Sequence, residues 1–92
     1  MSLQWLFDVI QDRRDNPAEG SYTSRLLVEG LPKIAQKVGE EATETVVAAL
    51  SQDDQHLIAE VADLTYHVLV LLAARRLSLA AVMAELERRH NS

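Results

Sequence analysis

The sequence predicts an all-α fold, formed as a single domain over residues 1–92. Apolar residues recur along most of the chain at the three- and four-residue spacing of amphipathic helices. The prolines and all but one of the glycines stand at or between the ends of these periodic segments, where helices begin or stop. One segment, 54–76, is apolar on nearly every side, which is typical of the central helix of a bundle.

Two short helices are predicted in the first third of the chain. Ser2 is suited to cap a helix that ends near Arg14. Its apolar stripe repeats at i, i+3, i+4 and i+7 and consists of Leu3, Leu6, Phe7 and Ile10. The stretch 15–20 is rich in helix-breaking residues and predicts a loop. A second helix starts within 21–24, and Gly30 is suited to end it in a left-handed conformation.

Three further helices follow. The spacing of apolar residues predicts a helix over 32–51, which has a proline in its first turn. Gly39 lies inside this helix, where glycine costs about 1 kcal/mol relative to alanine, so we expect another helix or a ligand to approach closely there. The turn 51–54 supplies capping residues for the helix 54–76, and a final amphipathic helix begins at Ser78.

The apolar helix 54–76 predicts association with a second subunit. A helix that is apolar all round needs neighbours on all sides, and the other helices of one 92-residue chain are too few to surround it. A membrane span is the alternative, because about 22 residues can cross a bilayer. Glu60, Asp63 and His67 interrupt the helix, and the uninterrupted apolar run 68–74 is too short, so we expect no membrane span.

Composition narrows the classes of function. Fourteen acidic and nine basic residues give a net charge of −5, which disfavours an extended nucleic-acid surface. A small anionic ligand would then need a metal ion or a local basic pocket. The absence of cysteine excludes disulfides, thiolate zinc sites and cysteine nucleophiles. Residues 1–12 mix charged and apolar side chains without a secretory segment, which predicts a cytoplasmic protein.

Two acidic pairs on the long helices suggest a metal site. Glu41 and Glu44 are three residues apart, as are Glu60 and Asp63, and helical residues at this spacing lie about 5–6 Å apart on one face. The turn between the helices returns the chain antiparallel, so the two pairs are expected to face each other. Their mutual repulsion and hard oxygen ligands favour Mg²⁺, or Mn²⁺, as the ion between them. His67, one turn beyond Asp63, is expected to support the metal ligands rather than act as a base.

A solvated helix surface is the plain alternative for these acids, and for the first pair alone it is the better explanation. The second pair interrupts the most apolar helix, where ionised side chains are costly unless they are paired or metal-bound, and this favours a metal site. Lys33 and Lys37 precede Glu41 at four-residue spacing. They either bind substrate phosphates, or Lys37 forms a surface ion pair with Glu41.

The acidic pattern resembles the signature of the MazG-like, all-α nucleotide pyrophosphohydrolases. Within that superfamily, segments 20–23, 33–41 and 62–67 resemble the phosphoribosyl-ATP pyrophosphohydrolase family. The resemblance implies an antiparallel helical bundle completed by homodimerisation. It also implies Mg²⁺-dependent hydrolysis of phosphoribosyl-ATP at the α–β phosphoanhydride, giving phosphoribosyl-AMP and pyrophosphate, the second step of L-histidine biosynthesis.

The resemblance implies roles for individual residues. The Mg²⁺ ligands would be Glu41, Glu44, Glu60 and Asp63. Glu40 would be a further ligand or would orient the attacking water, which completes a catalytic set of five acids. Four residues would bind or enclose the substrate: Tyr22, Thr23, Lys33 and Lys37. His67 would support the metal ligands.

Two other functions remain open at this point. A house-cleaning nucleoside triphosphate pyrophosphohydrolase, acting on dUTP or dCTP, would use the same chemistry on another substrate. Base-stacking aromatics are expected in such a pocket, and the whole chain has only Trp5, Phe7, Tyr22 and Tyr66. A non-catalytic helical dimerisation module would carry its acids only for solubility, and it would bind no divalent metal.

Overall fold

The structure, a computed structural model, describes residues 1–91. These residues form five helices: α1 (Leu3–Asp15), α2 (Tyr22–Glu29), α3 (Leu31–Ser51), α4 (Asp54–Ala74) and α5 (Leu79–His90). No strand occurs within residues 1–91, which confirms the all-α prediction. The predicted helix ends agree to within two residues; the largest difference is at α4, which stops at Ala74 instead of 76.

Short polar side chains fix where four of the helices begin. In each case the capping oxygen accepts a hydrogen bond from the backbone N–H three residues further on, and the caps are Ser2, Ser21, Asp53 and Ser78. Gly30 separates α2 from α3 with φ 96° and ψ −179°. The positive φ explains the glycine, but the extended ψ shows that the predicted left-handed helical ending is wrong.

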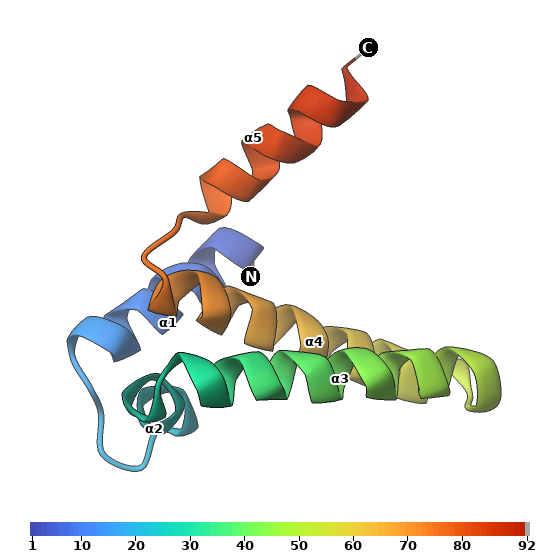
Figure 1. The fold of residues 1–92 in the computed structure, drawn as a ribbon, viewed down its shortest axis with the longest axis horizontal. Coiled ribbons are helices and arrows are strands. Elements are labelled where there is room, and N and C mark those ends of the chain that lie inside the picture. The colour runs from blue at the N-terminus through green and yellow to red at the C-terminus, as the bar shows by residue number, and fades with distance from the viewer. Residues whose placement is uncertain (92) are drawn as a thin grey trace.

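The long helices α3 and α4 lie side by side and antiparallel (Figure 1). Helix α1 packs on α4, and α2 contacts α1, α3 and α4. The buried apolar core consists of Phe7, Ile10, Leu26, Ile34, Leu69, Val70, Ala73 and Leu79. Because α4 contributes to this core only through its C-terminal half, its N-terminal half, which carries Glu60 and Asp63, is left free to form a polar site with α3.

Much apolar surface of the long helices is uncovered in the single chain. Only 22% of the most apolar 18-residue window of α4 is buried. Exposed apolar side chains on α3 and α4 include Val46, Val47, Leu50, Ile58 and Val61. Helix α5 projects away from the other helices (Figure 1), and the radius of gyration of 14.3 Å exceeds the roughly 12 Å expected of a compact domain of this length.

The space around Gly39 differs from expectation. A Cβ atom at this position would meet nothing within 4 Å, so no helix of the same chain within residues 1–91 approaches it. The predicted close approach of another helix is therefore wrong for the single chain, and the approach of a ligand stays a prediction.

By length and composition alone, α4 is also the one helix within residues 1–91 that could cross a membrane. Two acids and a buried histidine occupy its middle, at Glu60, Asp63 and His67, and Glu41 of α3 lies beside the acids. Ionisable groups in these places are costly in a bilayer, so α4 is not a clear membrane span.

Candidate active site

Three carboxylates meet between the long helices. Glu41 of α3 and Glu60 and Asp63 of α4 each offer an oxygen atom, and these atoms all lie within 4.8 Å of one another. Glu41 is buried, with 6% of its surface exposed, Glu60 is half-buried and Asp63 is exposed. This confirms that the acids of the two helices converge, and it leaves the cluster open on the side of Asp63.

The buried carboxylate oxygens fit a divalent metal. Glu41 Oε2 and Glu60 Oε2 are inaccessible to solvent and have no hydrogen-bond partner within residues 1–91. An unpaired buried polar atom costs about 1–3 kcal/mol, and more if it is charged. A cation between the three carboxylates would offset this cost and their mutual repulsion, so the donor set suits a hard divalent ion.

Glu44 and Glu40 lie outside this three-acid cluster. Glu44 is exposed and shares an open hollow of about 380 Å³ with Glu60, on the neighbouring side of α3. Glu40 is exposed and accepts a hydrogen bond from Gln36 Nε2 at 2.8 Å, while Lys37 Nζ lies 3.5 Å from its other oxygen. The bond from Gln36, followed by the charge of Lys37, lowers the pKa of Glu40. Metal or water contacts of these two acids remain predictions.

Thr45 contacts α4 from α3 at the level of the acids, a contact that the sequence did not reveal. Its hydroxyl has one proton, which it donates to the backbone oxygen of Glu41 at 2.8 Å, and the backbone oxygen of Glu60 lies 3.3 Å from the same hydroxyl. The hydroxyl therefore links the two helices beside two of the three clustered acids. The only signal in the sequence is a threonine one turn after Glu41, and threonine often bonds back to the preceding turn.

Lys37 forms ion pairs with the acidic residues of its own helix. Its Nζ lies 3.4 Å from Glu41 Oε1, in addition to its contact with Glu40. Burial lowers the pKa of Lys37, but Tyr22, Glu41 and Glu40 together outweigh it and raise the pKa. Of the two interpretations of this lysine, the ion pair is confirmed and the phosphate contact remains a prediction. Lys33 is exposed and makes no ion pair within residues 1–91.

On the other side of the acids, α2 contacts α4 through polar side chains. Tyr22 Oη lies 3.1 Å from His67 Nε2, and Thr23 Oγ1 is hydrogen-bonded to Tyr66 Oη. His67 Nδ1 lies 2.7 Å from the backbone oxygen of Asp63. His67 thus bonds to the backbone of an acidic residue in the cluster, and the two predicted substrate residues of α2 contact α4 about one helical turn beyond that residue.

Sequence reasoning missed a cation at this end of the site. The guanidinium of Arg25 lies 5.3 Å from the ring centre of Tyr22, within cation–π range. Arg25 is exposed and makes no ion pair within residues 1–91. The four-residue periodicity that drew attention to Lys33 and Lys37 does not extend to α2, so nothing in the pattern pointed to Arg25.

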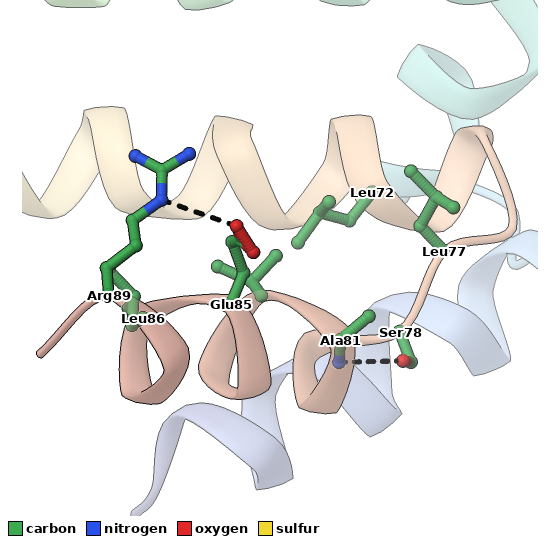
Figure 2. A pocket seen from close by; sticks show the side chains of 8 residues that line it. Leu72, Leu77, Ser78, Ala81, Glu85, Leu86 and Arg89 are labelled. Carbon is green, nitrogen blue, oxygen red and sulfur yellow. Dashed lines mark hydrogen bonds and ion pairs between the residues drawn. The ribbon is translucent and has the colours of Figure 1, made fainter. Parts of the chain in front are cut away.

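A separate apolar hollow of about 260 Å³ lies between the C-terminal end of α4 and α5. Figure 2 shows Leu72, Leu77 and Leu86 along it, with Glu85 and Arg89 paired at one end. None of the acids of the cluster lines this hollow. It has no grouped donors for a phosphate or a metal, so we do not assign the chemistry to it.

The family model and the relatives that this chain matches agree on one family. Residues 3–90 match the model of the family described as phosphoribosyl-ATP pyrophosphohydrolase. A phosphoribosyl-ATP pyrophosphatase of Listeria monocytogenes is 57% identical over 87 residues, covering 95% of this chain and 84% of the relative. Proteins of the same name from Erythrobacter litoralis and Clostridium botulinum are 56% and 49% identical, covering 96% and 91% of this chain and 85% and 76% of their own lengths. The chain therefore belongs to the phosphoribosyl-ATP pyrophosphohydrolase family of hydrolytic enzymes.

Proposed function

We propose that this chain hydrolyses phosphoribosyl-ATP to phosphoribosyl-AMP and pyrophosphate, the second step of L-histidine biosynthesis, with Mg²⁺ or Mn²⁺ as cofactor. The observation that carries the proposal is the pair of buried, unpartnered oxygens, Glu41 Oε2 and Glu60 Oε2, beside Asp63. Family membership supports the substrate, since the relatives bear the name phosphoribosyl-ATP pyrophosphatase.

The acids would hold the metal, and the remaining polar groups would handle substrate and water. Glu41, Glu60 and Asp63 are the ligands that already converge, and Glu44 would join them from the adjoining hollow. When bound, Mg²⁺ polarises a phosphoryl oxygen and offsets the charge on departing pyrophosphate.

Glu40 would orient the attacking water, and its exposure and its lowered pKa, which keeps it ionised, support this role. The water oxygen bonds to the α phosphorus as the bond from that phosphorus to the α–β bridging oxygen breaks. Lys33 and Lys37 would neutralise phosphate charge. The ion pairs of Lys37 with Glu40 and Glu41 hold its ammonium group beside these two acids. Tyr22 and Thr23 would enclose the substrate from α2.

We also propose a cytoplasmic homodimer. The uncovered apolar side chains of α3 and α4 support it, because a soluble protein rarely leaves such a surface in water. Sedimentation at micromolar concentration should give a species of twice the chain mass. A single-chain mass would contradict the dimer and leave the proposed chemistry unaffected.

The decisive assay is pyrophosphate release from phosphoribosyl-ATP, with dUTP and dCTP as competing substrates. We expect release that depends on Mg²⁺, stops with EDTA and returns with excess Mg²⁺. Activity that is insensitive to EDTA would contradict a metal enzyme, and a preference for dUTP or dCTP would favour the house-cleaning alternative. A chain without activity, whose thermal midpoint does not change with Mg²⁺ or Mn²⁺, would be the non-catalytic module.

A further inference from the structure

Tyr66 has no role in the chemistry described above, yet its hydroxyl is bonded to a predicted substrate residue. Consecutive residues of α2 meet consecutive residues of α4: Tyr22 bonds to His67, and Thr23 bonds to Tyr66. The three aromatic rings are packed together, with Tyr66 and His67 edge to face at 5.0 Å between centroids. The pairing runs in opposite directions along the two helices, and the two hydrogen bonds leave their α2 hydroxyls in different states.

The proton of Tyr22 is already used. His67 Nδ1 lies 2.7 Å from the backbone oxygen of Asp63, and a carbonyl oxygen only accepts, so Nδ1 carries the proton. In a neutral imidazole the other nitrogen, Nε2, is then an acceptor. When the imidazole is neutral, the Tyr22 hydroxyl donates to Nε2 across the 3.1 Å contact, and its proton is then held by His67.

The proton of Thr23 is free. A phenol is a stronger acid than an aliphatic alcohol, so Tyr66 is the better donor in the bond between the two hydroxyls. Burial is the main cause that raises the pKa of Tyr66, so its hydroxyl keeps its proton at neutral pH. With Tyr66 donating, Thr23 Oγ1 accepts, and its own proton can point elsewhere. Phosphate oxygens accept hydrogen bonds, so this proton suits a phosphate.

We propose that Tyr66 is a positioning residue that donates to Thr23 Oγ1 and so directs the Thr23 proton to a phosphate oxygen of the substrate. Tyr22, by contrast, anchors α2 to His67. The proposal rests on the proposed function for the identity of the ligand. It gives different hydrogen bonds to the two α2 residues that would enclose the substrate: Thr23 donates to a phosphate oxygen, and Tyr22 bonds to His67 and holds α2 in place.

The test measures binding separately from turnover. The probe is an analogue of phosphoribosyl-ATP in which a methylene group replaces the α–β bridging oxygen, titrated calorimetrically in Mg²⁺. We expect Thr23→Val to weaken binding about tenfold, as for the loss of one hydrogen bond to a charged group. Tyr66→Phe should weaken binding about fivefold, and the double variant should bind no more weakly than Thr23→Val alone, because both changes remove the same contact.

Two further variants separate positioning from packing. Thr23→Ser keeps the hydroxyl and should bind the probe as tightly as the unmodified chain does. When Thr23→Ser is combined with Tyr66→Phe, binding should weaken as it does for Tyr66→Phe alone. Thr65→Val is the matched control, since within residues 1–91 the Thr65 hydroxyl bonds only to the Val61 oxygen of its own helix, and affinity should not change. Circular dichroism should show that every variant keeps its helix content.

Additive losses in the double variant, or full affinity in Tyr66→Phe, would overturn the positioning role, as would a failure of the unmodified chain to bind the probe. Turnover of phosphoribosyl-ATP itself tests the proposed function separately. A chain that shows the coupled binding pattern but releases no pyrophosphate would contradict the proposed hydrolysis and leave the role of Tyr66 intact.

Discussion

The polar face of α4 has two ends, which differ in how their polar atoms are paired. At the first end, Glu60 Oε2 and the neighbouring Glu41 Oε2 of α3 are buried and lack partners within residues 1–91, and the exposed Asp63 lies beside them. One turn later, at Tyr66 and His67, the side-chain polar atoms are bonded to α2 or to the backbone. The comparison teaches that the unpaired end is available to bind a ligand, while the paired end holds two helices in place. We call these the acidic end and the bonded end.

The largest expected effect is at the acidic end. Asp63→Asn removes the charge of a proposed metal ligand, so we expect pyrophosphate release to fall by about 100-fold or more and the stabilisation by Mg²⁺ to disappear. Asp54→Asn is the matched control, because Asp54 lies on the same helix outside the cluster and its loss should leave activity unchanged. Steady-state kinetics and thermal melts with and without Mg²⁺ measure both effects. Equal activity of the two variants would remove the distinction between the ends.

At the bonded end, stability should change instead. His67→Ala deletes a buried ring and both of its hydrogen bonds, so we expect a loss of about 2–3 kcal/mol in the free energy of unfolding, measured in urea. His90→Ala, at an exposed histidine near the end of α5, should cost less than about 0.5 kcal/mol. A His67 variant as stable as the His90 variant would mean that the bonded end does not hold α2 to α4.

A smaller effect is expected where α2 begins. Ser21→Ala removes the cap that accepts from the Ser24 N–H and should cost about 1 kcal/mol. Ser51→Ala serves as the control, since that hydroxyl only bonds back to Val47 of the same helix, and its loss should change stability by less than about 0.5 kcal/mol. Urea unfolding of both variants gives the comparison; if the two cost the same, capping does not define the start of α2.

The smallest effect concerns Asp53, the carboxylate that caps α4 and that, unlike the acids of the cluster, has hydrogen-bond partners. The backbone N–H of His56, and then its side chain, lower the pKa of Asp53 below its ordinary 3.8. The contribution of Asp53 to the stability of the folded state is therefore complete above about pH 3.8. It is lost as the pH falls through the lowered pKa that Asp53 has in the folded state. The difference in thermal midpoint between the unmodified chain and Asp53→Asn should shrink between pH 6 and pH 3. A difference that grows toward acid would contradict this sign.

Sequence periodicity was sufficient to predict the five helices and the convergence of Glu41 with Glu60 and Asp63. The convergence follows from the short turn, which fixes the register of α3 against α4. Periodicity did not show that Glu44 lies outside the cluster. Residues three apart differ by about 60° around a helix axis, so when Glu41 is buried against α4, Glu44 points toward the edge of the interface.

The bonded end was less accessible to sequence reasoning. Thr23 and Tyr66 are 43 positions apart, and their contact depends on the angle at which α2 crosses α4, which no local pattern specifies. Thr45 was missed for a related reason, because a threonine in a helix interior carries no sign of which backbone oxygens it will reach. What escaped prediction was therefore the set of polar contacts between helices.

The uncovered apolar flank of α3 and α4 has a consequence for how the protein would be handled. If a second copy covers that flank, folding and assembly form one linked equilibrium, and dilution then favours unfolding by mass action. The melting temperature would then be a function of protein concentration as well as of sequence, so melting temperatures of variants could be compared only at equal concentration.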